Sequence, residues 1–239
     1  MRPADGFSHS TAALLQGIPL PRKLETDSRV HVTSIDPALR MRRPGVMGHH
    51  SKSVTFVTHR GLRLVAPAHV FSQLASMLSL DDLVAVGDFL VTPPRRGTRR
   101  QPPLCTAEEL GAAIPHGARG AIRAHRALKE VRIGAESRME TLLRLVLVRA
   151  GLPEPQLNPG VPIGTDTLHP DLLFPQWRVV LEYEGDGHRT DPNAWRRDIW
   201  RREAFLEAGY RVVQVHRDDV LKEPEALLAR VARAFAQSR

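Results

Sequence analysis

The segment LHPDLLFPQWRVVLEYEGDGHR, residues 168–189, combines two short apolar runs with several acidic side chains. The runs LLF and VVL flank the break PQW, which predicts two buried strands joined by a tight turn. If that turn is centred on Gln176 and the residue after it, Asp171 lies directly across from Glu182. Because side chains alternate between the two faces of a strand, Glu184 then shares the face of Glu182. A register slip of one residue would break this arrangement.

Three carboxylates on one face of a sheet require something that offsets their repulsion. Like charges so close raise one another's pKa and destabilise the fold unless they are protonated or neutralised. Oxygen ligands favour a hard cation over zinc, so we expect Asp171, Glu182 and Glu184 to bind Mg²⁺ or Mn²⁺. Such an ion polarises a phosphoryl oxygen and generates hydroxide from bound water. The alternative is purely structural: Glu184 is solvated at the strand end, and Asp171 caps a turn.

The bulk composition predicts a soluble globular protein. The net charge is +8, from 34 basic and 26 acidic residues, and the pI is about 10.6, which favours either a polyanionic partner or simple solubility. Cys105 is the only cysteine, which excludes an intramolecular disulfide and a cysteine-based zinc site. No apolar run has membrane length and the N-terminus does not resemble a signal peptide, so we expect a cytoplasmic location and no membrane partner. The oligomeric state is left open.

The order of patterns along the chain predicts two domains of α/β class. Residues 1–92 alternate helical patterns with β-like runs and predict a small α+β accessory domain. Residues 93–134 begin with the proline- and arginine-rich stretch TPPRRGTRRQPP and predict a linker with connecting helices. Residues 135–239 predict a helix, two or three strands, a helix, a strand and a helix. His49 and His50 are adjacent in a strand and therefore point to opposite faces, so we do not expect them to form a metal pair.

A family resemblance gives these patterns a function. Residues 135–239 contain, in order, SRMETLL with Glu140, HPDLLF with Asp171, LEYEG with Glu182 and Glu184, and WRRDIWRREAFLEAGYRVVQV. This series resembles the PD-(D/E)XK nuclease superfamily, most closely the branch similar to very-short-patch-repair (Vsr) endonucleases. The resemblance implies a restriction-endonuclease-like core of a helix, a three-stranded sheet, a helix and a strand. It also implies metal-dependent hydrolysis of DNA phosphodiester bonds, with Glu140 as a further ligand, direct or through water.

One motif position departs from the superfamily pattern. Glu184 occupies the position of the superfamily's lysine, and the Vsr-like branch commonly has a histidine near this turn instead. The resemblance therefore implies His188 as the general base or as the group that orients the attacking water. We expect four arginines on the following helix to contact phosphates, although an exposed basic helix face is an equally good interpretation of each one. These are Arg196, Arg197, Arg201 and Arg202.

The N-terminal part has a resemblance of its own. The pieces FSHSTAALLQGIPLP, VHVT, RRPGVMGHH and LDDLVAVGDFLV resemble the region that precedes this nuclease-like domain in actinobacterial proteins, a region likened to abortive-infection antitoxins. We therefore expect an Mg²⁺-dependent deoxyribonuclease, with DNA, or RNA, as its partner. The alternative is a non-cleaving nucleic-acid-binding regulator on a nuclease scaffold. The missing lysine favours the regulator, whereas the retained carboxylates disfavour it because they repel phosphate.

Overall fold

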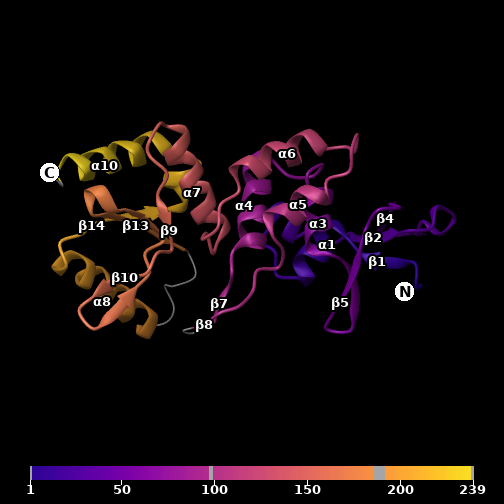
Figure 1. Ribbon diagram of the computed structural model, residues 1–239, viewed down its shortest axis with the longest axis horizontal. Coiled ribbons are helices and arrows are strands. Elements are labelled where there is room, and N and C mark those ends of the chain that lie inside the picture. The colour runs from indigo at the N-terminus through magenta and orange to yellow at the C-terminus, as the bar shows by residue number, and fades with distance from the viewer. Residues whose placement is uncertain (1, 97–98, 186–191, 238–239) are drawn as a thin grey trace. The chain divides into compact units, whose positions relative to one another are not determined.

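The chain divides into two compact units, residues 1–133 and residues 134–239. The computed structural model describes residues 2–96, 99–185 and 192–237. Each unit combines helices with a β-sheet, so the α/β class expected from the sequence is confirmed (Figure 1).

The first unit is built on a six-stranded sheet with the order β3-β4-β2-β1-β6-β5. Its strands are β1 (Asp5–Phe7), β2 (Val30–Ser34), β3 (Arg42–Arg43), β4 (Val46–His50), β5 (Phe56–His59) and β6 (Leu62–Val65). Strand β1 is antiparallel to β2 and parallel to β6, and β2 is parallel to β4. The β5–β6 hairpin turns through Arg60 and Gly61, which both have positive φ, as a two-residue turn of type I′ requires.

Six α-helices are described in the first unit. They are α1 (His9–Leu15), α2 (Arg22–Glu25), α3 (Pro67–Leu74), α4 (Leu80–Val91), α5 (Ala107–Ala112) and α6 (Ala121–Glu130). Helix α1 contacts β2 and β6, and α3, α4, α5 and α6 pack against one another. Local signals set several of the starts: Pro67 opens α3, the Ser79 side chain caps α4, and a capping box of Thr106 and Glu109 begins α5.

The segment expected to connect the domains lies within this first unit. Helices α5 and α6, which fall inside residues 93–134, pack on α3 and α4 rather than standing apart from them. The arginine-rich stretch forms two short antiparallel strands, β7 (Arg95–Arg96) and β8 (Arg99–Arg100). The boundary between the units therefore follows α6, at Ile133 and Gly134.

The second unit contains a four-stranded sheet with the order β14-β13-β12-β9 and a separate β10–β11 hairpin. Its strands are β9 (Gln156–Leu157), β10 (Val161–Ile163), β11 (Asp166–Leu168), β12 (Leu172–Phe174), β13 (Val179–Glu184) and β14 (Arg211–His216). Its helices are α7 (Arg138–Arg149), α8 (Pro192–Glu207), α9 (Arg217–Leu221) and α10 (Pro224–Ala236). The helix expected near residue 191, the buried strand after it and the closing helix correspond to α8, β14 and α10.

The register of the β12–β13 hairpin is the one predicted from the sequence. Leu172 pairs with Leu181 and Phe174 with Val179, across the 3₁₀ turn Pro175–Trp177. One residue beyond the paired strand, Asp171 therefore lies opposite Glu182. Strand β14 continues the sheet on the other side of β13 in parallel, and it pairs Glu182 with Gln214.

Strand alternation separates two apolar clusters on the two faces of this sheet. On one face, side chains of β12, β13 and β14 such as Phe174 and Leu181 pack with α7, α9 and α10. On the other face, Leu173 and Val180 pack with Phe205 of α8 and with Val161. The sheet is thus covered by helices on both faces, and α8 lies on the face that carries the acidic residues.

Candidate functional site

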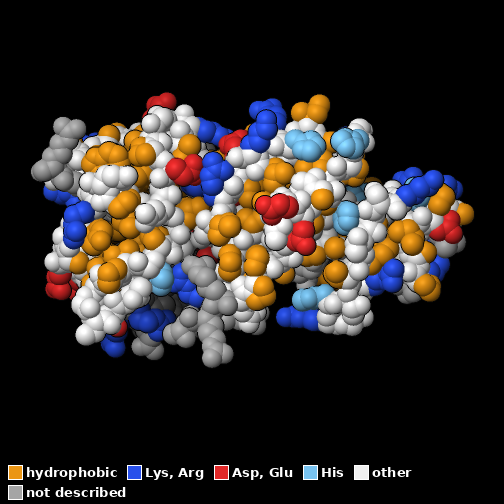
Figure 2. Space-filling model, in the orientation of Figure 1, with side chains coloured by type: hydrophobic (Ala, Val, Ile, Leu, Met, Phe, Trp, Pro, Cys, Tyr) orange, Lys and Arg blue, Asp and Glu red, His pale blue; other side chains and the backbone are white. Residues whose placement is uncertain are grey.

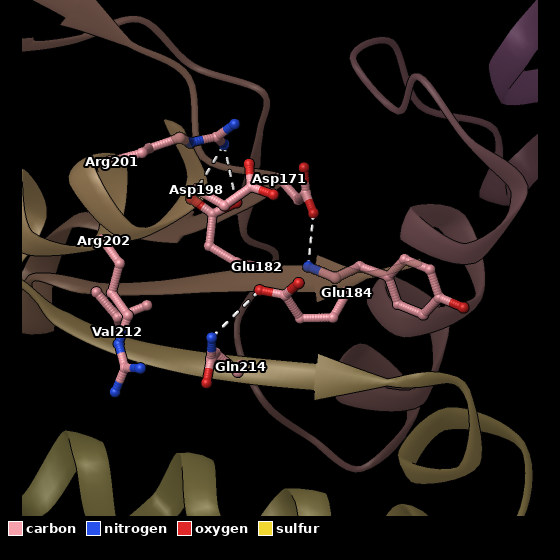
Figure 3. Close-up of a pocket in the computed structure, with 9 residues that line it drawn as sticks. Asp171, Glu182, Glu184, Asp198, Arg201, Arg202, Val212 and Gln214 are labelled. Atoms are coloured by element: carbon pink, nitrogen blue, oxygen red, sulfur yellow. Dashed lines mark hydrogen bonds and ion pairs between the residues drawn. The ribbon is translucent and has the colours of Figure 1, made fainter. Parts of the chain in front are cut away.

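A pocket of about 180 Å³ lies where the parallel strands β13 and β14 approach their carboxyl ends. It is lined by Asp171, Glu182, Tyr183, Glu184, Asp198, Arg201, Arg202, Val212 and Gln214 (Figure 3). The three carboxylates predicted from the sequence therefore line one pocket.

The acidic lining follows directly from the strand periodicity. Val180, Glu182 and Glu184 alternate along β13 and share the face covered by α8. Val180 contacts Phe205, whereas the next two members of this row are the acids. The polar pocket thus begins where the apolar contact between β13 and α8 ends.

Helix α8 supplies the opposite wall from a single helical face. Asp198, Arg201, Arg202 and Phe205 are spaced i, i+3, i+4 and i+7, which places them on one side of a helix. Phe205 has no exposed surface and anchors this side to the sheet, so the other three side chains point into the pocket. Asp198 was not predicted as a site residue, and its spacing from Phe205 is the signal that would have found it.

Each of the three predicted ligands has a partner of its own. The backbone N–H of Tyr183 donates to Asp171 Oδ2 at 2.6 Å, and Gln214 Nε2 donates to Glu184 Oε1 at 3.2 Å. Arg201 Nη2 donates to both carboxylate oxygens of Glu182, at 2.8 and 3.0 Å, and to the carbonyl oxygen of His169. Arg201 is therefore the cation that the described structure places beside Glu182.

Burial dominates the electrostatics of the pocket. It raises the pKa of Glu182 from 4.5 to about 8, against the opposing effect of the Arg201 charge. It also raises the pKa of Asp171, opposed chiefly by the hydrogen bond from the Tyr183 N–H. Burial thus favours the protonated forms of Asp171 and Glu182. A cation added beside them would stabilise their ionised forms.

Glu140 is close to the pocket but is not among the residues that line it. It is buried near the start of α7, where its Oε2 accepts hydrogen bonds from the Glu136 N–H at 2.8 Å and from Asn158 Nδ2 at 2.6 Å. Burial, followed by the charge of Asp171, raises its pKa to about 7. The charge of Asp171 therefore acts on Glu140, while hydrogen bonds hold Glu140 against Asn158.

The remaining predicted residues divide into two groups. Arg201 and Arg202 line the pocket, whereas Arg196 and Arg197 are exposed on α8 and do not. His188 lies outside the described residues. In the first unit, the ligand atoms of three histidines lie within 4.8 Å of one another. Within the described ranges, no three carboxylate oxygens approach one another as closely.

Comparisons with known proteins place this α/β chain in a family. It is 31% identical over 235 residues to the uncharacterized protein MT2308 of Mycobacterium tuberculosis strain CDC 1551 / Oshkosh, and the match covers 96% of this chain and 80% of that protein. The uncharacterized protein Rv2248 of strain ATCC 25618 / H37Rv matches with the same identity and the same coverage. The chain therefore belongs to the family of these mycobacterial proteins.

Two further comparisons gave no match. No family model matches the chain, and no solved structure does. In the parts of the chain that the structure describes, no helix combines the length and the apolar character needed to span a bilayer.

Proposed function

We propose that the second unit is a metal-dependent nuclease that hydrolyses DNA phosphodiester bonds on a restriction-endonuclease-like core. The observation that carries this proposal is the composition of the pocket, which combines four carboxylates with two arginines beside the parallel strand pair. Carboxylates can bind a hard cation and guanidinium groups can bind phosphate, and both interactions serve metal-dependent phosphodiester hydrolysis. The resemblance in residues 135–239 supports the same function.

Asp171, Glu182 and Glu184 would hold Mg²⁺ or Mn²⁺, and their chemistry fits such an ion. All three offer oxygen ligands, and the pKa of both Asp171 and Glu182 is raised, so a cation would relieve the cost of ionising them. When bound, the ion supplies Lewis acidity toward a phosphoryl oxygen and lowers the pKa of bound water. Before an ion binds, Arg201 contacts Glu182 at 2.8 Å, and it would share that carboxyl group with the ion afterwards.

The chain's own residues position the substrate and move the proton. Arg202 is exposed beside the pocket, and together with Arg201 it would bind non-bridging phosphate oxygens. On the visible face of the molecule, Lys and Arg side chains are scattered rather than gathered into one patch (Figure 2). We assign the phosphate contact to the arginines of the pocket because they lie beside its carboxylates. His188, from the resemblance, would accept the proton of the attacking water.

One observation favours the non-cleaving regulator as a second candidate. Arg201 already occupies both oxygens of Glu182, where the metal would bind, and no lysine stands at the motif position. In this alternative, the arginines of the pocket bind a phosphate without metal. In a nuclease, cleavage requires Mg²⁺ or Mn²⁺ and is lost in EDTA. In the regulator, binding is metal-independent and cleavage does not occur.

Cleavage assays with a matched pair of variants test the proposal. Glu182→Gln removes the pocket carboxylate but keeps its shape, and Glu203→Gln removes the same charge from an exposed position of α8. With labelled DNA and RNA substrates and Mg²⁺, Mn²⁺ or EDTA, we expect metal-dependent cleavage by the wild type and Glu203→Gln and none by Glu182→Gln. His188→Ala should slow cleavage by about 10²–10⁴-fold. Metal-independent binding without cleavage by the wild type would replace the nuclease with the regulator.

A further inference from the structure

The first unit brings together three histidines that the sequence keeps apart. His9 begins α1 directly after β1, His31 lies in β2 and His49 lies in β4. Each offers one ring nitrogen, and these three nitrogens lie within 4.8 Å of one another. In the described part of the chain, these histidines are the group of three potential metal ligands that lie this close together. They belong to a different unit from the acidic pocket.

The sheet order and register create this cluster. Strands β2 and β4 are parallel neighbours that pair His31 with Met47, so His49, two residues further along β4, faces the same side as His31. His50 points to the opposite face and is exposed, as strand alternation predicts. The partners of His49 are therefore on other elements of the sheet, and His50 is not one of them.

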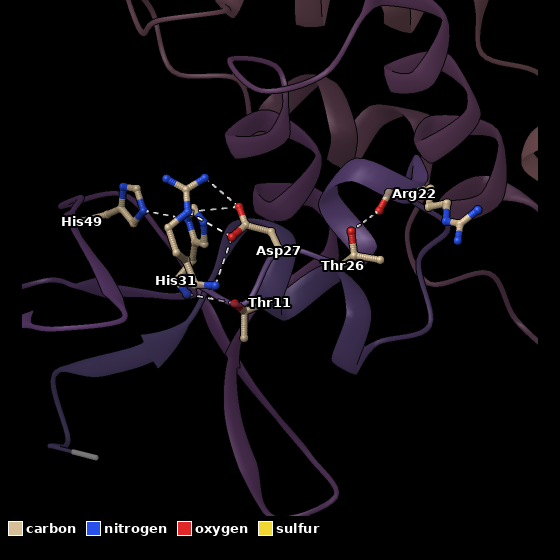
Figure 4. Close-up of polar contacts among 7 residues, drawn as sticks. Thr11, Arg22, Thr26, Asp27, His31 and His49 are labelled. Atoms are coloured by element: carbon tan, nitrogen blue, oxygen red, sulfur yellow. Dashed lines mark hydrogen bonds and ion pairs between the residues drawn. The ribbon is translucent and has the colours of Figure 1, made fainter.

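The contacts among the three rings are close. His31 Nδ1 lies 3.0 Å from His49 Nε2 (Figure 4), and the rings of His9 and His49 stack with their centroids 3.8 Å apart. His9 Nδ1 lies 3.0 Å from the buried Ser8 hydroxyl, and in the tautomer in which Nδ1 donates to that hydroxyl, His9 Nε2 keeps a free lone pair. The three rings are therefore in mutual contact, and the Ser8 hydroxyl holds the ring of His9.

Two features of the cluster are energetically costly. His31 is only 3% exposed, and its buried Nε2, the ring nitrogen other than the Nδ1 that faces His49, has no hydrogen-bond partner among the described residues. His9 has a φ of 49°, in the left-handed region that non-glycine residues seldom adopt. Strained backbone of this kind persists where the surroundings hold it, and it is concentrated at ligand sites. Here the Gln73 side chain accepts a hydrogen bond from the His9 N–H at 3.0 Å.

The chemistry of three imidazoles selects the type of ligand. Neutral imidazole nitrogen binds Zn²⁺ and neighbouring transition metals, whereas Mg²⁺ prefers oxygen. Burial first, and then the neighbouring imidazoles, lowers the pKa of His9 to about 3, so this ring is in the neutral form that metals bind. In a tetrahedral site with Zn–N bonds of about 2.0–2.1 Å, two ligand nitrogens lie roughly 3.3 Å apart. The 3.0 Å between His31 and His49 is within a few tenths of an ångström of that spacing.

We infer that His9, His31 and His49 form a transition-metal site in the first unit that takes Zn²⁺ and leaves a fourth coordination position open. Three protein ligands plus an open position is the arrangement of zinc sites that bind water or an exchangeable ligand. Binding requires the stacked rings of His9 and His49 to tilt apart, so that their lone pairs converge. The site is independent of the acidic pocket, which offers oxygen ligands only.

Metal titration of the untagged full-length chain tests this site. After dialysis against EDTA and then buffer, Zn²⁺ is titrated against a chromophoric chelator, the bound metal is counted by mass spectrometry, and Co²⁺ is added separately for its visible d–d spectrum. We expect one Zn²⁺ per chain in the presence of excess Mg²⁺ and a Co²⁺ spectrum of tetrahedral type. His9→Gln and His49→Gln should each weaken Zn²⁺ binding by about 100-fold or more, while His50→Gln, on the other face of β4, should leave it unchanged.

Each remaining outcome has a definite meaning. Absence of Zn²⁺ binding in the wild type overturns the site, and so does binding that survives both His9→Gln and His49→Gln. Circular dichroism establishes that each variant is folded; if His49→Gln does not fold, His9→Gln decides the question. Asp171→Asn should leave Zn²⁺ binding intact, so failure of the acidic pocket as a metal site does not affect this result.

Discussion

Replacing Glu182 by glutamine should make the protein more stable at neutral pH, although the change lies inside the pocket. The Glu182 side chain is 16% exposed, and burial raises its pKa from 4.5 to about 8. The folded protein therefore binds this proton more tightly than the unfolded chain. The resulting contribution to stability is fully present below pH 4.5 and is lost as the pH rises through 8. Glutamine cannot ionise and does not undergo this loss.

The size of the effect follows from the two pKa values. At about 1.36 kcal/mol per pKa unit, the whole window between 4.5 and 8 corresponds to roughly 5 kcal/mol. By pH 7 the loss is on the order of 3 kcal/mol, because the folded carboxyl group is still largely protonated there while the unfolded one is ionised. We therefore expect the two proteins to have equal free energies of unfolding at pH 4. At pH 7, Glu182→Gln should be the more stable by about 3 kcal/mol.

Urea unfolding followed by tryptophan fluorescence measures this difference in the free energy of unfolding of the second unit. All three tryptophans of the chain, Trp177, Trp195 and Trp200, belong to residues 134–239, so the signal reports on the second unit. Unfolding is compared at pH 4, 5.5 and 7 in EDTA, with Glu203→Gln as the matched control for loss of one negative charge. Added Mg²⁺ should narrow the gap at pH 7, because a cation stabilises the ionised carboxylate of the wild type.

The reasoning is refuted if Glu182→Gln is less stable than the wild type by the same amount at every pH. That result would mean that Arg201, which contacts Glu182 at 2.8 Å, holds the carboxylate ionised throughout the range. An equal gain in Glu203→Gln would also refute it, because the effect would then follow from net charge and not from burial of Glu182.

Three further predictions concern the second unit. Mg²⁺ or Mn²⁺ should raise the melting temperature of the wild type. At an ion concentration of a hundred times the dissociation constant, the free energy of unfolding should increase by about 2.7 kcal/mol. Asp171→Asn should respond less in the same thermal scan, and an unchanged response would argue against a metal there. Phe205→Ala removes a fully buried ring between α8 and the sheet and should cost about 3–5 kcal/mol in urea unfolding, whereas a loss below 1 kcal/mol would show that α8 is held by other contacts. Gly134→Ala should destabilise by about 1–3 kcal/mol, because φ is +124° there and a Cβ would lie 2.7 Å from that of Leu157; unaltered unfolding would contradict this close approach.

The sequence was sufficient to predict the centre of the second unit. A strand has a period of two, and a three-residue break between two apolar runs leaves few ways to pair them. The register that places Asp171 across from Glu182 could therefore be derived from the segment itself, and the described pairing of Leu172 with Leu181 confirms it. The spacing of Asp198, Arg201 and Phe205 also indicates one helical face, which forms the other wall of the pocket, although Asp198 was not predicted as a site residue.

Other features depend on which elements become neighbours, and local patterns do not contain that information. Glu140 was predicted as a further ligand, direct or through water, and packing places it against Asn158, where burial and then the charge of Asp171 raise its pKa. The proline-rich stretch after residue 92 was predicted as the start of a linker, yet α5 and α6 pack back on α3 and α4 and move the boundary between units to Gly134.

The two candidate sites show where the sequence by itself reaches its limit. The acidic residues of β12 and β13 come from one hairpin, so short-range periodicity determined that they share a face. The pairing of Glu182 with Arg201 joins a strand to a helix that packs over it, and only the tertiary structure decided that contact. His9, His31 and His49 come from three separated elements, and the sheet order that makes β2 and β4 parallel neighbours brings them together. The physical reason is that the two kinds of contact have different causes. Backbone geometry determines which residues share a face within one element or hairpin. Burial of apolar surface determines which distant elements pack side by side.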